Sequence, residues 1–418
     1  MKKVISTVLE GYSPLKIRNL RIYLAGQAIS LVGTWMQATA QSWVVWDLSH
    51  SVLQLGIVSM LGFIAFLILG PWTGVWADRL NRRKLLIGTQ VSALILAIIF
   101  AILVQINLIK IWHIYILSTL LGIVNSLDMP AQQAFIGDLA GMEQIRKAVV
   151  INSAIIQISR MAGPAMAGWM IAAAGVAPAF WINGLSFIAV IITLMMVTSH
   201  QVIHPKSGNH LNEFKEGIDF IRNNPRILDL MILTLLLTFF GFSIIQIMPA
   251  IATDVLKGHS EVLGLLLGAS GAGALIGATL FVPIFAKFKR IGVVVTSAVV
   301  YTGFCFILFS LSKNLYISTF IIFMSGLFAP VIFTTTNGLL QIFAPPHMRA
   351  RVLSVLLMVT FGVQPIASLF IGLTGHFVGP EMAILLNGVI MIVGSLLMLF
   401  FRSELMKWEL GILTKQST

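Results

Sequence analysis

Long apolar runs, separated by short polar turns, recur along the whole chain. A helix needs about 20 apolar residues to cross the hydrocarbon core of a bilayer, and twelve runs reach this length. They fall at 22–46, 52–77, 85–107, 111–139, 148–175, 179–198, 227–252, 262–286, 291–312, 315–343, 352–376 and 381–401. The pattern predicts an all-α polytopic membrane protein with twelve transmembrane helices in two six-helix bundles.

The longest polar interruption divides these runs into two sets of six. It covers 199–226 and predicts three parts: an N-terminal six-helix bundle over 1–198, a cytoplasmic linker over 199–226 and a C-terminal six-helix bundle over 227–418. The two halves also look like weak repeats, because the segment from Gln133 to Arg146 parallels the segment from Asn337 to Arg349. Transporters built from such repeats commonly bind their substrate at the interface between them.

Composition and charge agree with a membrane protein. Of the 418 residues, 58% are hydrophobic and 10% are charged, against roughly 25% charged residues in ordinary soluble domains. If both termini are cytoplasmic, 23 of the 27 Lys and Arg residues fall on the cytoplasmic side, and only Lys110, Lys257 and Lys313 fall outside. The positive-inside rule therefore predicts a multi-pass plasma-membrane protein with this orientation.

The same orientation accounts for the net charge of +12, so no nucleic-acid partner is expected. The single cysteine, Cys305, excludes a disulfide framework and any site built from several cysteine ligands. We expect no metal and no cofactor.

The loop after the second run carries the sequence GVWADRLNRRK, from Gly74 to Lys84. It resembles the signature loop of the major facilitator superfamily, G-x-x-x-D-R-x-G-R-R-K, and Asn81 stands where the family usually has glycine. Asn81 is expected to adopt the left-handed backbone of that glycine. The resemblance implies a conformational gate at the cytoplasmic helix ends, made by Gly74, Asp78, Arg79, Arg82, Arg83 and Lys84, with Asp138 and Arg146 as neighbours. An ordinary basic turn is the alternative.

Two further segments resemble exporters of the same superfamily. Gly163, Pro164 and Gly168 match the C-terminal part of the Gly-Pro motif of proton-coupled antiporters, although close packing and a proline bend explain the same residues. Segments 18–27 and 128–135 resemble a bacterial branch that includes enterobactin exporters and macrolide efflux proteins, which implies a bacterial inner membrane. Gln132 departs from that branch, which often has arginine there.

Two charged residues are predicted near the middle of the membrane. Asp128 precedes Asp138 by ten residues and Arg160 follows Lys147 by thirteen, which places both at depths of about 15–20 Å. A charge at this depth is costly, so we expect the two to pair. The pair either neutralises itself and joins two helices, or makes Asp128 a proton carrier that Arg160 controls.

Polar residues follow one face of the first predicted helix at steps of three and four, and such a stripe should face a cavity or another helix. The resemblance places helices one, four, seven and ten around a central cavity. The candidates for its lining are Gln27, Thr34, Gln37, Gln41, Asn125, Gln132, Gln157, Gln246, Asn337, Gln341 and Gln364, and interhelical hydrogen bonding is the competing use of each amide. Trp35, Phe242 and other aromatic residues are candidate walls.

The leading hypothesis is a monomeric secondary transporter that exports an amphipathic small molecule in exchange for protons by alternating access. Its expected partners are the substrate, protons and the lipid bilayer. Nutrient uptake by the same fold is the first alternative, and an intramembrane enzyme is a weaker one because no H-E-x-x-H motif is present. An ATP-driven pump is disfavoured because the chain lacks a G-x-x-x-x-G-K-[ST] phosphate loop. The chain is therefore not expected to be an enzyme.

Overall fold

The computed structural model describes residues 13–198, 210–285, 288, 290–345 and 348–402. Within these ranges the side chains of residues 71, 74, 75, 77–79, 142, 210–213 and 350 are not described. The described residues form helices and no β-strand elements. Ten helical segments among them are long and apolar enough to cross a membrane.

The first half of the chain contains five long helices. The fourth of them, α5, bends at Gly141, where the backbone takes the left-handed φ of 70°, a conformation that favours glycine. The bend divides α5 into two arms that correspond to the predicted runs 111–139 and 148–175. The elements are η1 (Ser13–Lys16), α2 (Arg18–Ser49), α3 (Val52–Arg79), α4 (Arg82–Gln105), α5 (Ile111–Ala174) and α6 (Ala177–Met196).

The second half contains six further membrane-length segments, and π-turns interrupt several of them. A π-turn inserts one extra residue into the helical ladder and often bends the helix. The elements are α7 (His210–Asn223), α8 (Pro225–Leu236), η2 (Leu237–Gly241), η3 (Phe242–Ile247), α9 (Met248–Ala250), η4 (Ile251–Val255), α10 (Ser260–Ile276), η5 (Gly277–Phe281), α11 (Val282–Phe285), α12 (Ile291–Leu311), α13 (Leu315–Gly326), α14 (Ala329–Phe343), α15 (Arg349–Leu357), η6 (Met358–Gly362), α16 (Gln364–Val378) and α17 (Pro380–Phe401).

Twelve spans are consistent with this structure, although length and apolar composition alone support ten. The two predicted spans beyond those ten are α2 and the second arm of α5. Both are long enough to cross a bilayer. They are more polar than the others because α2 carries the polar stripe and the second arm of α5 carries Arg146, Lys147 and Arg160.

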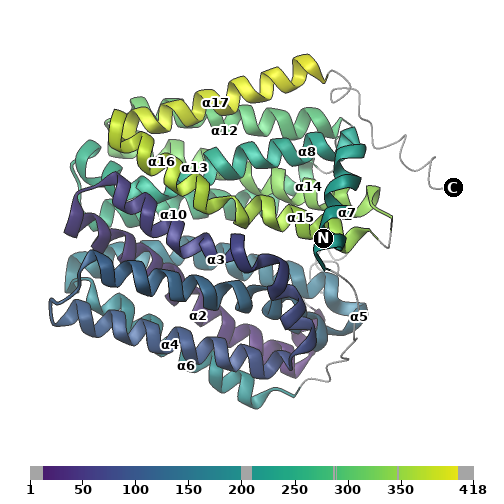
Figure 1. Cartoon of the computed structure of the whole chain (residues 1–418). Coiled ribbons are helices and arrows are strands. Elements are labelled where there is room, and N and C mark those ends of the chain that lie inside the picture. The colour runs from purple at the N-terminus through teal and green to yellow at the C-terminus, as the bar shows by residue number, and fades with distance from the viewer. Residues whose placement is uncertain (1–12, 199–209, 286–287, 289, 346–347, 403–418) are drawn as a thin grey trace, which may run out of the picture.

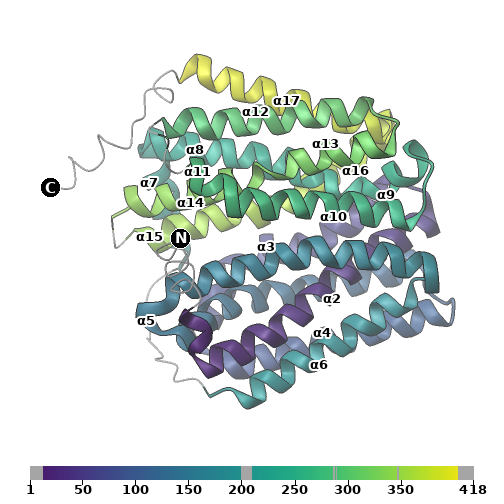
Figure 2. The same cartoon turned by 180° about the vertical axis from the view of Figure 1, so that it is seen from behind.

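The helices of each half lie together, as both views show (Figures 1 and 2). In the first half α2 packs on α5 and α6, and α4 packs on α6; in the second half α12 packs on α17 and α10 on α13. The halves meet where α5 lies against α10 and α3 lies against α16. This is the predicted all-α arrangement of two bundles, and the exact limits 1–198 and 227–418 stay a prediction.

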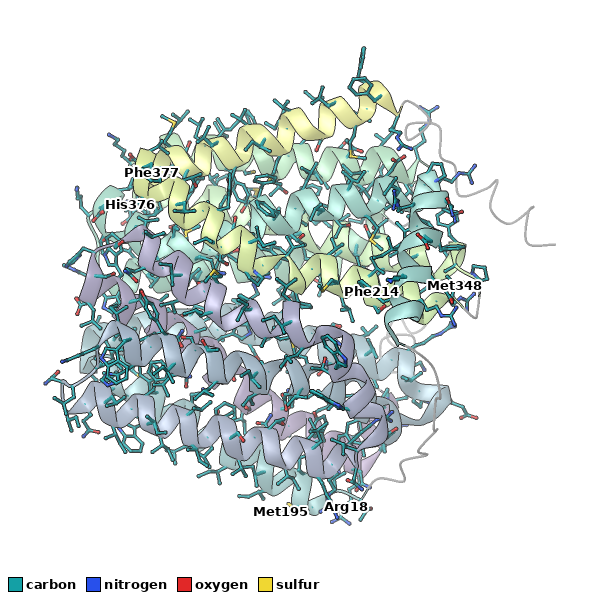
Figure 3. All side chains as sticks on the ribbon, in the orientation of Figure 1. Arg18, Met195, Phe214, Met348, His376 and Phe377 are labelled. Atoms are coloured by element: carbon teal, nitrogen blue, oxygen red, sulfur yellow. The ribbon has the colours of Figure 1, made fainter. Side chains whose placement is uncertain are left out.

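Part of the predicted linker is an amphipathic helix. Residues 210–223 form α7, whose apolar residues Phe214 and Ile221 pack in one cluster with Met348 and Val352 beside α15. The remainder of the linker that precedes α7 lies outside the described residues. Phe214 and Met348 lie at one end of the molecule (Figure 3), which we call the α7 end.

At the other end, which we call the opposite end, the two halves touch backbone to backbone. A Cβ atom on Gly56 of α3 would lie 2.7 Å from the Cα of Gly372 in α16, and a Cβ on Gly168 of α5 would lie 2.7 Å from the Cα of Gly264 in α10. Gly372 precedes His376 by four residues, and Figure 3 places His376 at the opposite end. Only glycine allows helix axes to approach this closely, so the halves are closed together there.

Candidate functional site

Asp128 is buried inside the N-terminal bundle, on the first arm of α5. Two side chains of α4 donate to its carboxylate: the Thr89 hydroxyl lies 2.5 Å from Oδ1, and the Gln90 amide lies 3.1 Å from Oδ1 and 3.3 Å from Oδ2. Gln132, one turn along α5, donates its amide to Oδ2. All three donors are neutral, and no ion pair between described residues includes Asp128.

The hydrogen-bond network of Asp128 continues to the first helix. Gln27 of α2 is buried and donates its amide to Oε1 of Gln132 at 2.7 Å, so Gln132 receives a bond from α2 and passes one to Asp128. The network therefore joins α2, α4 and α5. Every member belongs to the N-terminal bundle, which lets the bundle move as a unit without breaking any of these bonds.

Arg160 lies on the second arm of α5, at the boundary with the C-terminal bundle. Its guanidinium carbon lies 5.7 Å from the ring centre of Trp35 in α2 and 5.8 Å from the ring centre of Phe242 in η3. Both distances are within the range of cation–π attraction. No hydrogen bond or ion pair joins the guanidinium to a described residue, so its N–H donors are left without an acceptor in this part of the chain.

The expected pairing of Asp128 with Arg160 is wrong, since no ion pair connects them. Both residues lie on α5, but position along a helix axis does not fix the direction around it. Each residue turns a helix by about 100°, and the bend at Gly141 separates the arms that carry the two charges. The carboxylate faces α4, whereas the guanidinium faces η3.

The environments of the two charges differ in energy as well as in geometry. A charged side chain in the membrane interior costs about 2.5–3.5 kcal/mol or more. Each aromatic ring returns about 0.5–2 kcal/mol to a cation such as Arg160. The two rings therefore offset much of this cost, but they leave the guanidinium N–H donors without an acceptor among the described residues.

A small cavity lies beside Arg160, between the second arm of α5 and the helices of the C-terminal bundle. Its volume, counted for the centres of water molecules, is about 40 Å³, which is room for a few waters. Arg160 is the one charged residue in a lining that is otherwise apolar or hydroxyl-bearing, with Phe242, Ile245, Leu267, Ser270, Thr302, Phe306, Ser325 and Ala329 among its members. A drug-sized molecule does not fit in this cavity.

The signature loop fastens helices within the N-terminal bundle. Arg82 at the start of α4 forms an ion pair with Asp138 of α5 at 2.7 Å, and both side chains are largely buried. Arg83 donates to the carbonyl oxygens of Leu194 and Met195 at 2.6 and 2.7 Å, which satisfies the last turn of α6. Figure 3 places Met195 toward the α7 end of the molecule.

Asn81 does not adopt the left-handed backbone that we expected from the family glycine. Its φ is −65°, and its side-chain oxygen accepts the backbone N–H of Lys84 at 3.0 Å. Asn81 therefore caps the N-terminus of α4, a role in which asparagine is among the best residues. A short side-chain cap replaces the backbone turn that a glycine provides.

Four other predicted gate residues are placed less fully. The side chains at Asp78 and Arg79, like any contact of Gly74, lie outside the described part of the structure. Arg146 is exposed, and no hydrogen bond or ion pair links it to a described residue. Its expected place beside the signature loop therefore gains no support, and the gate stays a prediction supported by Arg82, Arg83 and Asp138.

The polar stripe of α2 faces neighbouring helices of its own bundle. Gln37 is buried and accepts the amide of Asn183 in α6 at 2.7 Å, and Gln41 donates to Ser118 of α5 at 2.9 Å. Thr34 bonds back to the carbonyl of Ser30 in the preceding turn. Of the two uses open to the stripe, interhelical bonding is the one that this state shows.

The remaining cavity candidates fall into two groups, those that hydrogen-bond to another described residue and those that do not. Gln246 accepts a bond from Ser59 at 2.7 Å across the boundary between the halves, Gln364 donates to the carbonyl of Thr238 at 3.0 Å, and Gln341 donates to Asn337. Asn125 and Gln157 make no hydrogen bond within the described residues and stay free to face a substrate.

The Gly-Pro segment lies at two close helix crossings. A Cβ on Gly163 would lie 2.5 Å from the Cβ of Trp35, and the carbonyl of Pro164 lies 2.7 Å from where a Cβ on Gly264 would be. With Gly168 it holds α5 against both α2 and α10. The segment acts here as a packing device, which agrees with both interpretations of the motif.

Sequence reasoning missed Thr89 and Gln90 as partners of Asp128. They are consecutive polar residues inside an otherwise apolar run, and such a pair in the membrane interior predicts a polar partner. Trp35 and Phe242 were predicted as aromatic walls, but their position beside Arg160 was not.

Comparisons with known proteins match this architecture over nearly the whole chain. The model of the transmembrane secretion effector family matches residues 9–414. The staphyloferrin A transporter of Staphylococcus aureus (strain NCTC 8325 / PS 47) is 27% identical over 390 residues, which cover 92% of this chain and 96% of that protein. Macrolide efflux protein A of Streptococcus pyogenes is 24% identical over 392 residues, with the same two coverages.

A solved structure shows the same fold. A bacterial homologue of the human lysosomal transporter Spinster, in an inward-facing and unoccupied conformation, aligns with a TM-score of 0.73 at 13% identity, over 94% of this chain and 98% of that chain. The two-bundle helical architecture, the signature loop and the family match agree with one another. The chain is a multi-pass membrane transporter, and it belongs to the transmembrane secretion effector family of the major facilitator superfamily.

Proposed function

We propose that this protein exports an amphipathic small molecule from a bacterial cell in exchange for protons, and that Asp128 is the group that takes up and releases the proton. The two bundles would alternate between a state closed at the opposite end and a state closed at the α7 end. The observation that carries the proposal is a buried carboxylate held by neutral donors alone.

The bonds around Asp128 suit both of its protonation states. Thr89 Oγ lies 2.5 Å from Asp128 Oδ1 and 2.9 Å from the carbonyl oxygen of Leu86, and a hydroxyl has one hydrogen to give. When the carboxylate is ionised, the Thr89 hydroxyl donates to it. When the carboxylate is protonated, its own O–H donates to Thr89, which then donates to Leu86. Protonation therefore changes the charge of the network while leaving it bonded.

A partner cation would hold Asp128 in its ionised form. No described cation forms an ion pair with Asp128. The Gln132 amide occupies the place where related exporters often carry arginine, and it donates to the carboxylate as a neutral group. Exchange of a proton at Asp128 thus changes the net charge of the N-terminal bundle interior. A change of net charge inside a low-dielectric bundle strongly shifts the equilibrium between the two conformations.

The outward direction of the proposal rests on the relatives named as efflux proteins and exporters, whereas charge and the closed boundary indicate the side from which a substrate enters. The cytoplasmic side assigned by the positive-inside rule is the α7 end. The glycine crossings close the halves at the opposite end, so a substrate would enter from the α7 end once the bundles part there. Release would follow when the crossings part, and proton uptake at Asp128 from outside would drive the return.

Candidate substrates come from the named relatives, one a staphyloferrin A transporter and one a macrolide efflux protein. Both names refer to molecules much larger than the cavity beside Arg160, so the bundles must separate to bind a compound of this size. A monomer is sufficient for the mechanism, since both charged sites lie within one chain.

The test uses inverted membrane vesicles that contain the protein and carry an imposed pH gradient, acid inside. A panel of amphipathic compounds, including a macrolide and a carboxylate siderophore, is added while a pH-sensitive dye reports the gradient. We expect at least one compound to discharge the gradient in wild-type vesicles and not in Asp128→Asn vesicles. Asp47→Asn, which removes an exposed carboxylate, is the matched control and should behave as wild type.

Two results would contradict the proposal. If a compound is transported without any proton movement, the protein is not an antiporter for it. If Asp128→Asn discharges the gradient as wild type does, the proton is carried elsewhere, and Asp138 nearer the α7 end becomes the next candidate. Movement of the proton and the compound in the same direction would indicate symport and so favour nutrient uptake.

A further inference from the structure

Arg160 is a cation that faces a cavity and has no counter-charge among the described residues. The cavity is lined by seventeen residues, of which Arg160 is the one that carries a charge. Cation–π contacts with Trp35 and Phe242 use the rings as walls but accept none of the five guanidinium N–H donors as a conventional hydrogen bond. A group with this many unused donors in a water-poor space is suited to a bound oxyanion.

We propose that Arg160 binds an oxyanion of the transported compound, so that the substrates of this protein are amphipathic organic anions that carry a carboxylate or a chemically similar group. This inference rests on the proposed export function and narrows its substrate class. The Arg160 site is separate from Asp128, which is bonded to α4 and α5 and makes no contact with the guanidinium.

The dimensions of the cavity fit the head group of such a compound and not its body. A volume of about 40 Å³ for water centres admits a few waters, which is the space a carboxylate needs. Ser270 of α10 also lines the cavity, and its hydroxyl makes no hydrogen bond within the described residues. It is thus a free donor from the C-terminal bundle, opposite the cation from the N-terminal bundle.

The position of Arg160 at the boundary gives the anion a mechanical effect. The carbonyl of Arg160 lies 2.7 Å from where a Cβ on Gly271 would be, so α10 crosses α5 at this very residue. An oxyanion bridging Arg160 and Ser270 would bind both bundles at once. Once the bundles part and the cavity widens, the apolar body would lie along its aromatic and aliphatic lining, among Phe242, Ile245 and Leu267.

The test compares three planar ligands of the same shape: 2-naphthoate, neutral 2-naphthamide and cationic 2-naphthamidine. Binding to the purified full-length protein is followed by thermal unfolding, which is read from the reaction of a maleimide dye with Cys305. This cysteine is buried and is the only one in the chain, so labelling reports unfolding. A ligand that binds the folded state raises the unfolding midpoint in proportion to its occupancy.

At a ligand concentration about ten times the Kd, we expect 2-naphthoate to raise the unfolding midpoint by about 2 °C. The amide and the amidine should raise the midpoint less or not at all. Arg160→Gln should weaken 2-naphthoate binding by about tenfold or more, as loss of a charge-assisted hydrogen bond does. Arg160→Lys should keep part of the preference for the anion, because lysine retains the charge but not the planar fork. Arg18→Gln, at an exposed position at the α7 end (Figure 3), is the control and should bind as wild type.

The assay involves no gradient and no transport, so its outcome is independent of the export test. Equal shifts with 2-naphthoate and 2-naphthamide in the wild type would overturn the proposal. So would a 2-naphthoate shift that persists in Arg160→Gln. If Arg160→Gln does not fold, Arg160→Lys decides between the outcomes. An undiminished 2-naphthoate shift in Arg160→Lys would show that the guanidinium of Arg160 does not bind the anion and would overturn the proposal. A reduced shift supports the proposal.

Discussion

The interior of the N-terminal bundle and the boundary between the bundles hold their helices together by different means. Inside the bundle, polar side chains bond one helix to the next: Gln27 to Gln132, Gln90 to Asp128, and Arg82 to Asp138. At the boundary, glycines such as Gly168 and Gly264 place backbone against backbone, with side-chain hydrogen bonds from Ser59 to Gln246 and from Ser260 to Gly168 beside them.

This difference suits two different roles: the N-terminal bundle moves as a rigid body, and the boundary between the bundles is the surface along which it moves. Hydrogen bonds inside a low-dielectric bundle are strong and directional, so they keep three or four helices in fixed relation. Parting the packed glycines costs lost van der Waals contact and, at Gly168, the one hydrogen bond that its carbonyl accepts from Ser260 at 3.2 Å. The two functional charges follow the same division, since Asp128 lies inside the body and Arg160 lies on its moving surface.

The largest effect is expected from a bulky side chain at the boundary. In Gly168→Leu the new Cβ would lie 2.6 Å from the carbonyl oxygen of Ser260, and overpacking of this kind costs about 1–3 kcal/mol in the closed state. Transport in inverted vesicles should fall about ten- to hundredfold. The protein should still fold, because each bundle is intact.

Gly88→Leu is the matched control for this substitution. No atom lies within 4 Å of a Cβ built on Gly88 in α4, so a leucine there should leave transport near the wild-type rate. Equal loss of transport in both variants would mean that the close contact of α5 with α10 has no special role, and the distinction between body and surface would fail.

A smaller effect is expected inside the bundle. Asn81→Ala removes the side-chain cap of α4 and should lower the free energy of unfolding by about 1 kcal/mol, whereas Asn81→Gly should lower it by a few tenths. Thermal unfolding read from Cys305 labelling measures both. Transport rates of the two variants should stay within about twofold of each other, since a cap in a fixed body sets stability more than motion. A loss of transport without loss of stability would place Asn81 in the gate instead.

The smallest effect is an expected absence of coupling between the two charges. For residues that share no partner, the effects of Asp128→Asn and Arg160→Gln on unfolding should add to within about 0.5 kcal/mol in the double variant. If the two charges paired, removal of one partner alone would cost about 3–5 kcal/mol, and the double variant would recover much of it. A double-mutant cycle by thermal unfolding distinguishes these results. Recovery of stability in the double variant would mean that Asp128 and Arg160 do pair, which would contradict the structure.

The sequence predicted the helices well, because the requirement for about 20 apolar residues leaves few alternatives. The runs at 291–312 and 381–401, for example, correspond to α12 and α17 within a residue or two. The helix α7 was missed inside the linker, although Phe214, Ile218 and Ile221 follow a helical period. The π-turns, such as η2 and η6, were not predictable, since they arise where packing demands an extra residue in the turn.

The sequence predicted which residues belong to the candidate site but not which of them contact one another. Asp128, Arg160, Gln27 and Gln132 were all named as candidates, yet the partners of each were not. Rotation about a helix axis depends on packing with helices far away in the sequence, and no local pattern encodes it. Asn81 illustrates the same limit, because either a left-handed turn or a side-chain cap satisfies its neighbours.

The central claim is that Asp128 couples transport to protons while the bundles move as bodies, and proteoliposomes containing purified Asp128→Asn test it most directly. Two rates are measured for a compound that the wild type transports: exchange of labelled for unlabelled compound without a gradient, and uptake or release driven by an imposed pH gradient. Our account predicts that the variant retains exchange within about threefold of wild type, since protonation is not needed for the bundles to part, and shows no gradient-driven movement. Gradient-driven transport at the wild-type rate in this variant would contradict the account.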